Sequence, residues 1–206
     1  MVRLIIFIFF FTLIHTVNGQ KNSFAKARPR TWTQKAMDEE ERNHNCIKKK
    51  YTSLTSRLKR YPFNVSSKIQ FASFEGDFYL LDKEIIQQDS FPRINDRMLY
   101  SKLTEVKTLT YLEVDKLTDI FYNYGFRGSI HVNIETACYN PRNAILFLDN
   151  NGEIVDFIEI CFECHKARTS SDKISLGDMC DQKLNMLFDL FKKVGIEYSI
   201  TGIKPD

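Results

Sequence analysis

Two apolar runs separated by a turn sequence form the clearest pattern in this chain. Residues 144–148 are apolar throughout, Asp149-Asn150-Asn151-Gly152 follows, and residues 153–160 are again rich in isoleucine, valine and phenylalanine. An Asn-Gly pair between two such runs favours a tight turn, and glycine readily takes the left-handed backbone conformation that the turn requires. The pattern predicts a β-hairpin with Gly152 in that conformation.

Helical periodicity predicts three helices. Around residues 35–60, acidic residues 38–41 precede basic residues 48–50, the order that a helix dipole favours. The apolar stripe of this first helix consists of Ile47, Tyr51, Leu54 and Leu58. The second helix begins after Thr110 as its N-cap and ends near Gly125. Its buried face consists of Leu117, Ile120, Phe121 and Tyr124.

The third helix is predicted near the end of the chain. Its apolar face consists of Cys180, Leu184, Leu187, Phe188, Phe191 and Val194. Asp178 or Ser175 is expected to cap its start, and Gly195 is placed to end it.

Further strands are expected at residues 68–75, in one or two pieces at 98–108, and at 130–135, where apolar and polar residues alternate. Residues 196–200 could add a short final strand. Hairpin strands and separate helices together predict an α+β fold, in which an antiparallel β-sheet carries at least three packed helices in a single domain.

The N-terminus resembles a secretory signal in its parts. Met1-Val2-Arg3 supplies one positive charge, residues 4–14 are apolar, and Val17-Asn18-Gly19 offers small residues for cleavage. The apolar run is about half the roughly 20 residues that span a bilayer, so a cleaved signal is favoured over a transmembrane anchor. We therefore expect a signal peptide at 1–19, a flexible polar leader at 20–33 and a domain at 34–206, secreted or periplasmic, with no stable membrane anchor after cleavage.

Charge narrows the choice of partners. The chain has 29 basic and 26 acidic residues, and removal of Arg3 with the signal leaves 28 and 26, a net charge of +2. Nucleic-acid-binding proteins usually carry a clear basic excess, so nucleic acid is not expected as the main partner. A protein partner is compatible with this balance.

Five cysteines lie in the expected mature chain, and outside the cytoplasm cysteines tend to pair. If Asp149 lies opposite Glu153, the same register places Cys138 opposite Cys164, although Pro141 interrupts the ladder. Cys180 begins the third helix, a loop away from Cys164. The sequence predicts that Cys138, Cys161, Cys164 and Cys180 gather at one end of the sheet and that Cys46 stays apart.

Such a cluster has several possible chemistries. Two disulfides among Cys138, Cys161, Cys164 and Cys180 suit an exported protein. The same four thiols, or a set in which His165 replaces one, would suit zinc. Cys161 and Cys164 alone form a C-x-x-C pair that suits thiol redox chemistry.

The run Cys161-Phe162-Glu163-Cys164-His165 also fits the C-x-x-C-H pattern of covalent haem attachment. It follows a predicted strand, whereas c-type cytochromes place this motif at the start of a helix, and Phe162 is unusually bulky for its position. Haem c is therefore a weaker alternative than zinc.

Other catalytic patterns are sparse. The sequence has no G-x-S-x-G elbow, P-loop or dinucleotide fingerprint. Glu159 and Glu163 share a strand face with Cys161 and are interpreted as a solvated face, and His131 as a surface histidine. The favoured function is an exported, non-enzymatic binding or structural domain stabilised by cysteines, with no cofactor. The alternative is a thiol-redox or zinc-binding protein that uses Cys161, Cys164 and His165.

Overall fold

The computed structural model describes residues 32–75, 78–81, 84–87, 93–94, 97–98, 103–132 and 138–200. The predicted signal peptide and the leader up to residue 31 lie outside these residues. Thr33–Asp206 form one compact unit, and the fold class is α+β, as predicted.

A five-stranded antiparallel sheet is the centre of the fold, with strand order β11-β10-β9-β2-β7. Its strands are β2 (Lys68–Phe74), β7 (Leu103–Thr108), β9 (Asn143–Leu148), β10 (Ile154–Cys161) and β11 (Lys166–Thr169). Two short hairpins lie between β2 and β7 in the sequence. They pair β3 (Phe78–Leu81) with β4 (Glu84–Gln87), and β5 (Arg93–Ile94) with β6 (Arg97–Met98).

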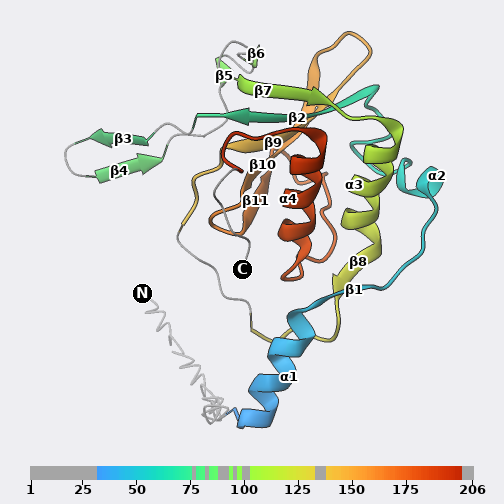
Figure 1. Ribbon diagram of the computed structural model, residues 1–206, viewed down its shortest axis with the longest axis vertical. Coiled ribbons are helices and arrows are strands. Elements are labelled where there is room, and N and C mark those ends of the chain that lie inside the picture. Colours follow the sequence, from blue (N-terminus) through green and yellow to red (C-terminus); the bar gives the residue numbers. More distant parts are fainter. Residues whose placement is uncertain are drawn as a thin grey trace, which may run out of the picture. The chain divides into compact units, whose positions relative to one another are not determined.

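Helices α3 (Tyr111–Asn123) and α4 (Lys183–Val194) pack together against one face of this sheet (Figure 1). The interface is rich in aromatic rings; Phe71 of β2 stacks on Phe191 of α4 with ring centroids 3.8 Å apart. Side chains alternate along each strand, so a different set of residues lies on the other face, and this set is also apolar. Its buried residues are Ala72, Phe74, Ala144, Leu146, Leu148 and Phe157.

The predicted hairpin is confirmed as β9 and β10. The Asp149 N–H donates to the Glu153 carbonyl over 2.9 Å, and Gly152 has φ +83°. Ile154 pairs with Leu148, but Asp156 rather than Val155 pairs with Phe147. Because of this bulge, every later pair of the ladder, as far as Ile160 with Asn143, joins a β9 residue to a β10 residue one position later than the turn register predicts.

Thr110 caps α3 as predicted, in a full capping box with Glu113. Leu117, Ile120 and Phe121 are buried as expected. Tyr124, however, lies beyond the helix in β8 (Tyr124–Phe126).

The first predicted helix is wrong over its second half. Helix α1 (Gln34–His44) ends before the apolar stripe, Cys46–Lys48 form strand β1, and α2 is a single turn at Leu54–Arg57. Strand β1 pairs with β8, so long-range pairing overrides the local helical period. The stripe residue Tyr51 is 83% exposed.

Three smaller predictions also fail. Residues 196–197 are irregular and residues 198–200 form a turn rather than a strand. Residues 130–132 are irregular, and the rest of the expected strand at 130–135 lies outside the described residues. Gln182, not Asp178 or Ser175, is the N-cap of α4, and it makes no side-chain capping bond.

Glu40 anchors α1 to the segment that follows β8. Its carboxylate accepts the backbone N–H groups of His131 and Val132 over 2.6 and 2.8 Å, and His131 Nδ1 lies 3.0 Å away. Hydrogen bonding from the His131 backbone is the main reason that the Glu40 pKa is lowered to about 2.

We predict a pH dependence from this contact. Because the folded-state pKa of Glu40 lies below its ordinary value of 4.5, the anchoring is complete above that value and is lost as pH falls through about 2. The backbone amide signals of His131 and Val132 should titrate in an NMR series with a midpoint near 2. A midpoint near 4.5 would show that the carboxylate does not hold these amides.

Candidate functional site

The predicted cysteine site lies at the turn that connects β10 to β11. Cys161 is the last residue of β10, residues 162–165 form the turn, and Lys166 of β11 is the strand partner of Cys161. His165 takes a left-handed backbone conformation with φ +49°. The C-x-x-C-H segment is therefore a β-turn between two strands.

A disulfide joins Cys138 to Cys164 with their Cα atoms 5.5 Å apart. The hairpin pairing predicted from the sequence places these two residues opposite each other. Cys161 is a free cysteine, and its Sγ lies within 4.8 Å of both disulfide sulfurs. Three of the four expected cysteines thus gather at one end of the sheet.

The prediction that Cys46 stays apart and that Cys180 joins the cluster is wrong. Cys46 and Cys180 form a second disulfide with a Cα–Cα distance of 5.0 Å. Gln182 supports this junction, because its Oε1 accepts the Cys46 N–H over 2.7 Å and its Nε2 donates to Asn45 over 2.8 Å. No local pattern could reveal a contact between residues separated by 134 positions.

The free thiol of Cys161 is buried in a small cluster with Tyr139 and Cys164. Only 2% of the residue is exposed, and the Asn140 N–H donates to its Sγ over 3.4 Å. Burial raises the pKa of this thiol, an effect that the backbone N–H groups of Asn140 and Cys164 partly oppose. The thiol is therefore largely protonated at neutral pH.

The prediction that Glu159 lies on a solvated face is wrong. It is 8% exposed rather than solvated, and its carboxylate accepts the Tyr139 hydroxyl over 3.1 Å. The Arg168 guanidinium lies 3.8 Å from the centre of the Tyr139 ring. Glu163 is exposed, as predicted, and forms an ion pair with Arg142 over 3.6 Å.

The donor atoms limit which groups this site could hold. Covalent haem attachment needs the thiols of both Cys161 and Cys164, and Cys164 is bonded to Cys138. Zinc needs thiolates, so Cys138 and Cys164 would become ligands only after reduction of their disulfide. As it stands, the cluster consists of one thiol beside one disulfide.

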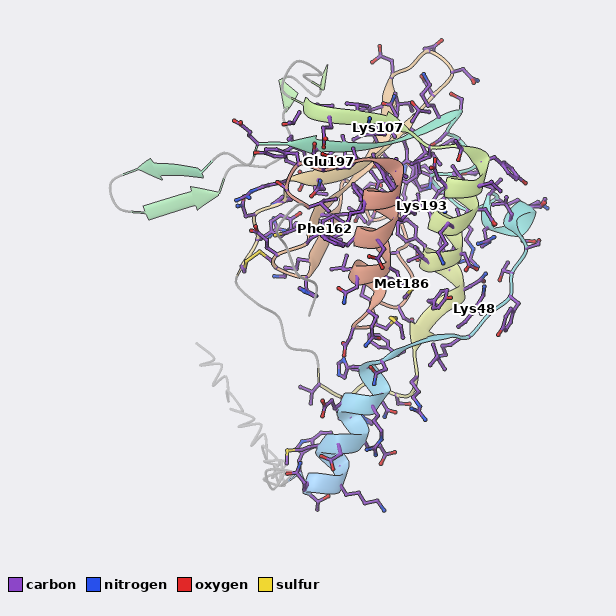
Figure 2. The ribbon with its side chains drawn as sticks, in the orientation of Figure 1. Lys48, Lys107, Phe162, Met186, Lys193 and Glu197 are labelled. Carbon is purple, nitrogen blue, oxygen red and sulfur yellow. A yellow bond between two sulfur atoms is a disulfide. The ribbon has the colours of Figure 1, made fainter. Side chains whose placement is uncertain are left out.

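A cleft of about 600 Å³ is a second candidate site, which the sequence did not reveal. Two helices line it with one face each. Helix α3 contributes Leu112, Asp115, Lys116, Asp119 and Asn123, and α4 contributes Met186, Asp189, Leu190 and Lys193. The other lining residues are Lys48, Tyr51, Thr52 and Arg57. Figure 2 shows Met186 and Lys193 on α4 and Lys48 at the end of β1.

Ion pairs organise the floor of this cleft. Arg57, 5% exposed, contacts the carboxylates of Asp115 and Asp119, the latter over 3.4 Å, and Lys48 Nζ lies 3.0 Å from Asp119. Burial would raise the Asp119 pKa, but hydrogen bonds from Asn123 and Lys48 outweigh it and lower the pKa. Two cations and two carboxylates therefore balance on the floor.

The rim of the cleft is different. Lys116, Lys193 and Asp189 are exposed, and none has an ion-pair partner among residues 32–75, 103–132 and 138–200. Two large apolar residues share the rim, with Tyr51 83% and Leu112 77% exposed. The rim thus combines excess positive charge with exposed apolar surface.

Comparisons with known proteins identify no relative: no family model, curated protein or solved structure matches the chain. Within the described part of the chain, no helix has both the length and the apolar character needed to cross a membrane.

Proposed function

We propose that this protein is an exported binding protein, whose disulfide-stabilised fold presents the cleft of α2, α3 and α4 to an acidic segment of a protein partner. The single observation that carries this proposal is the rim, where two lysines without ion-pair partners among the described residues lie beside two exposed apolar side chains. The signal-like N-terminus and the two disulfides support export, because disulfides persist in oxidising compartments.

The charge of the cleft favours an acidic partner. The floor ion pairs of Arg57 and Lys48 with Asp115 and Asp119 are already satisfied. The charges left on the rim are Lys116 and Lys193 against Asp189, a net of +1. Carboxylates of a partner would complement both lysines, and opposite potentials across an interface give specificity and faster association.

The apolar rim favours a macromolecular segment over a small ion. Tyr51 and Leu112 offer large contact areas, and a tyrosine in such a position is a typical anchor at protein interfaces. Lys48 lies 5.3 Å from the centre of the Tyr51 ring, which restrains that side chain before binding. A peptide that carries both carboxylates and apolar side chains would use both features.

Charge reversal on the rim tests the proposal. The probe is a fluorescein-labelled peptide of alternating glutamate and leucine, and a lysine–leucine peptide of equal length is its counterpart. We expect the acidic peptide to bind more tightly, and Lys116→Glu with Lys193→Glu to weaken that binding at least about tenfold in fluorescence anisotropy. Added salt should weaken the native binding as well.

The matched control is Lys35→Glu with Lys68→Glu, which makes the same charge change at exposed lysines outside the cleft. This control variant should bind the acidic peptide almost like the native protein. Equal binding of both peptides by the native protein, or equal losses in the two double variants, would contradict the proposal.

A further inference from the structure

Cys161 is a buried thiol beside a disulfide, in a chain with an odd number of cysteines. Its Sγ lies within 4.8 Å of the sulfurs of Cys138 and Cys164. A thiolate at such a position can attack a disulfide sulfur and displace the other cysteine. The three cysteines differ in exposure, since Cys161 and Cys164 are 2% and 6% exposed whereas Cys138 is an exposed residue.

We propose that Cys161, Cys164 and Cys138 form an internal thiol–disulfide relay, which transfers the free thiol from the buried Cys161 to the exposed Cys138 and so creates a surface site for mixed disulfides. Cys161 loses its proton and its Sγ attacks Cys164 Sγ. The Cys161–Cys164 bond forms, the Cys138–Cys164 bond breaks, and Cys138 leaves as a thiolate that takes up a proton. The step needs no external oxidant or reductant.

Exposure decides the direction of the exchange. Attack on Cys164 releases Cys138, whose thiolate is stabilised by water, whereas attack on Cys138 would leave a thiolate on the buried Cys164. A better-stabilised leaving thiolate departs faster. The product joins Cys161, at the end of β10, to Cys164 within the turn, a C-x-x-C spacing that is found in redox-active disulfides.

Contacts around the turn hold the reactants together. The Asn140 N–H hydrogen bond to Cys161 Sγ and the Arg142–Glu163 ion pair both connect the segment that carries Cys138 with the turn. The released Cys138 would therefore stay next to the turn, so the exchange is reversible. A disulfide-containing molecule from solution, such as a small peptide disulfide, could then react with Cys138 and form a mixed disulfide.

Several charged groups set the pH at which the relay runs. Burial raises the Cys161 pKa, Glu163 raises it further and Arg142 opposes this. Tyr139 packs in the same cluster as Cys161 and donates a hydrogen bond to Glu159, and Lys166 is the strand partner of Cys161. Exchange should consequently be slow near neutral pH and faster in mildly alkaline solution, where more thiolate is present.

Alkylation of the native protein, in which both disulfides are formed and one thiol is free, tests this relay. The protein is incubated with N-ethylmaleimide at about pH 8, quenched in acid and digested with trypsin and a glutamate-specific protease, which separate the three cysteines. We expect the label on Cys138 and a disulfide between Cys161 and Cys164. With glutathione disulfide as the probe, a glutathione adduct should form at Cys138.

Cys161→Ser and Cys161→Ala are the matched variants, and an intact Cys46–Cys180 disulfide shows that each has folded. Both should label at Cys138 at least about tenfold more slowly than the native protein, because the internal attacking thiol is gone. Label on Cys161 with Cys138–Cys164 intact, no label over many hours, or equal rates in the variants would each overturn the proposal. None of these results depends on the cleft.

Discussion

Replacement of Cys46 and Cys180 by alanine should lower the free energy of unfolding by about 5 kcal/mol, the largest effect expected in this protein. The two cysteines are separated by 134 positions, and a cross-link that closes so long a loop removes much conformational entropy from the unfolded chain. The bond also fastens strand β1 to the start of α4. Urea unfolding of the oxidised native protein and of the variant measures the difference.

The second disulfide supplies the comparison. Cys138 and Cys164 are separated by 26 positions, so the matched alanine pair should cost less, about 3.5 kcal/mol. Both variants should retain the α+β secondary structure in circular dichroism at low temperature. If removal of the shorter cross-link were the more destabilising change, loop length would not account for the stabilisation.

Lys183→Met should destabilise the fold by about 3 kcal/mol. Lys183 is fully buried, and its ammonium donates to the carbonyls of Phe121, Tyr124 and Leu176 over 3.0–3.1 Å. Two of these carbonyls belong to the C-terminal end of α3 and the residue after it. Methionine fills a similar volume but leaves all three acceptors without this donor.

The pH dependence of this loss identifies its cause. Burial lowers the Lys183 pKa from 10.5 to about 8, so between these values the unfolded chain binds more protons than the folded one. The contribution of Lys183 to stability therefore rises with pH over this window, and the gap between native and variant should widen from about pH 8 to pH 9.5. A Cys161→Ser background keeps thiol exchange out of the measurement.

Lys192→Met is the control, because Lys192 is an exposed residue of the same helix. Its effect should stay within about 0.5 kcal/mol. A gap for Lys183→Met that narrows as pH rises would contradict the lowered pKa of Lys183, because it would show that the fold stabilises the charged ammonium.

The sequence predicted the elements whose signals are local. The Asn-Gly turn predicted the β9–β10 hairpin, and the apolar face that ends at Gly195 predicted α4. Thr110 marked the start of α3 because an N-cap acts on residues only two or three positions along the chain. In each of these elements the local preference and the tertiary contacts favour the same conformation.

The failed predictions depend on partners distant in the sequence. Residues 46–48 have a helical period, but pairing with β8 and the bond to Cys180 make them a strand. The cleft was missed for a related reason. Its α3 and α4 faces are charged and have the pattern of solvated helix surfaces, and only the packing of both helices with Arg57 makes them the walls of one site.

The most direct test of an exported, disulfide-stabilised domain is the intact mass of the protein secreted by its own host, unfolded and alkylated without reduction. We predict a chain that begins at Gln20, contains two disulfides and carries one alkyl group, since one of the five cysteines is free. A chain that retains Met1, or one that carries three or more alkyl groups, would contradict this account.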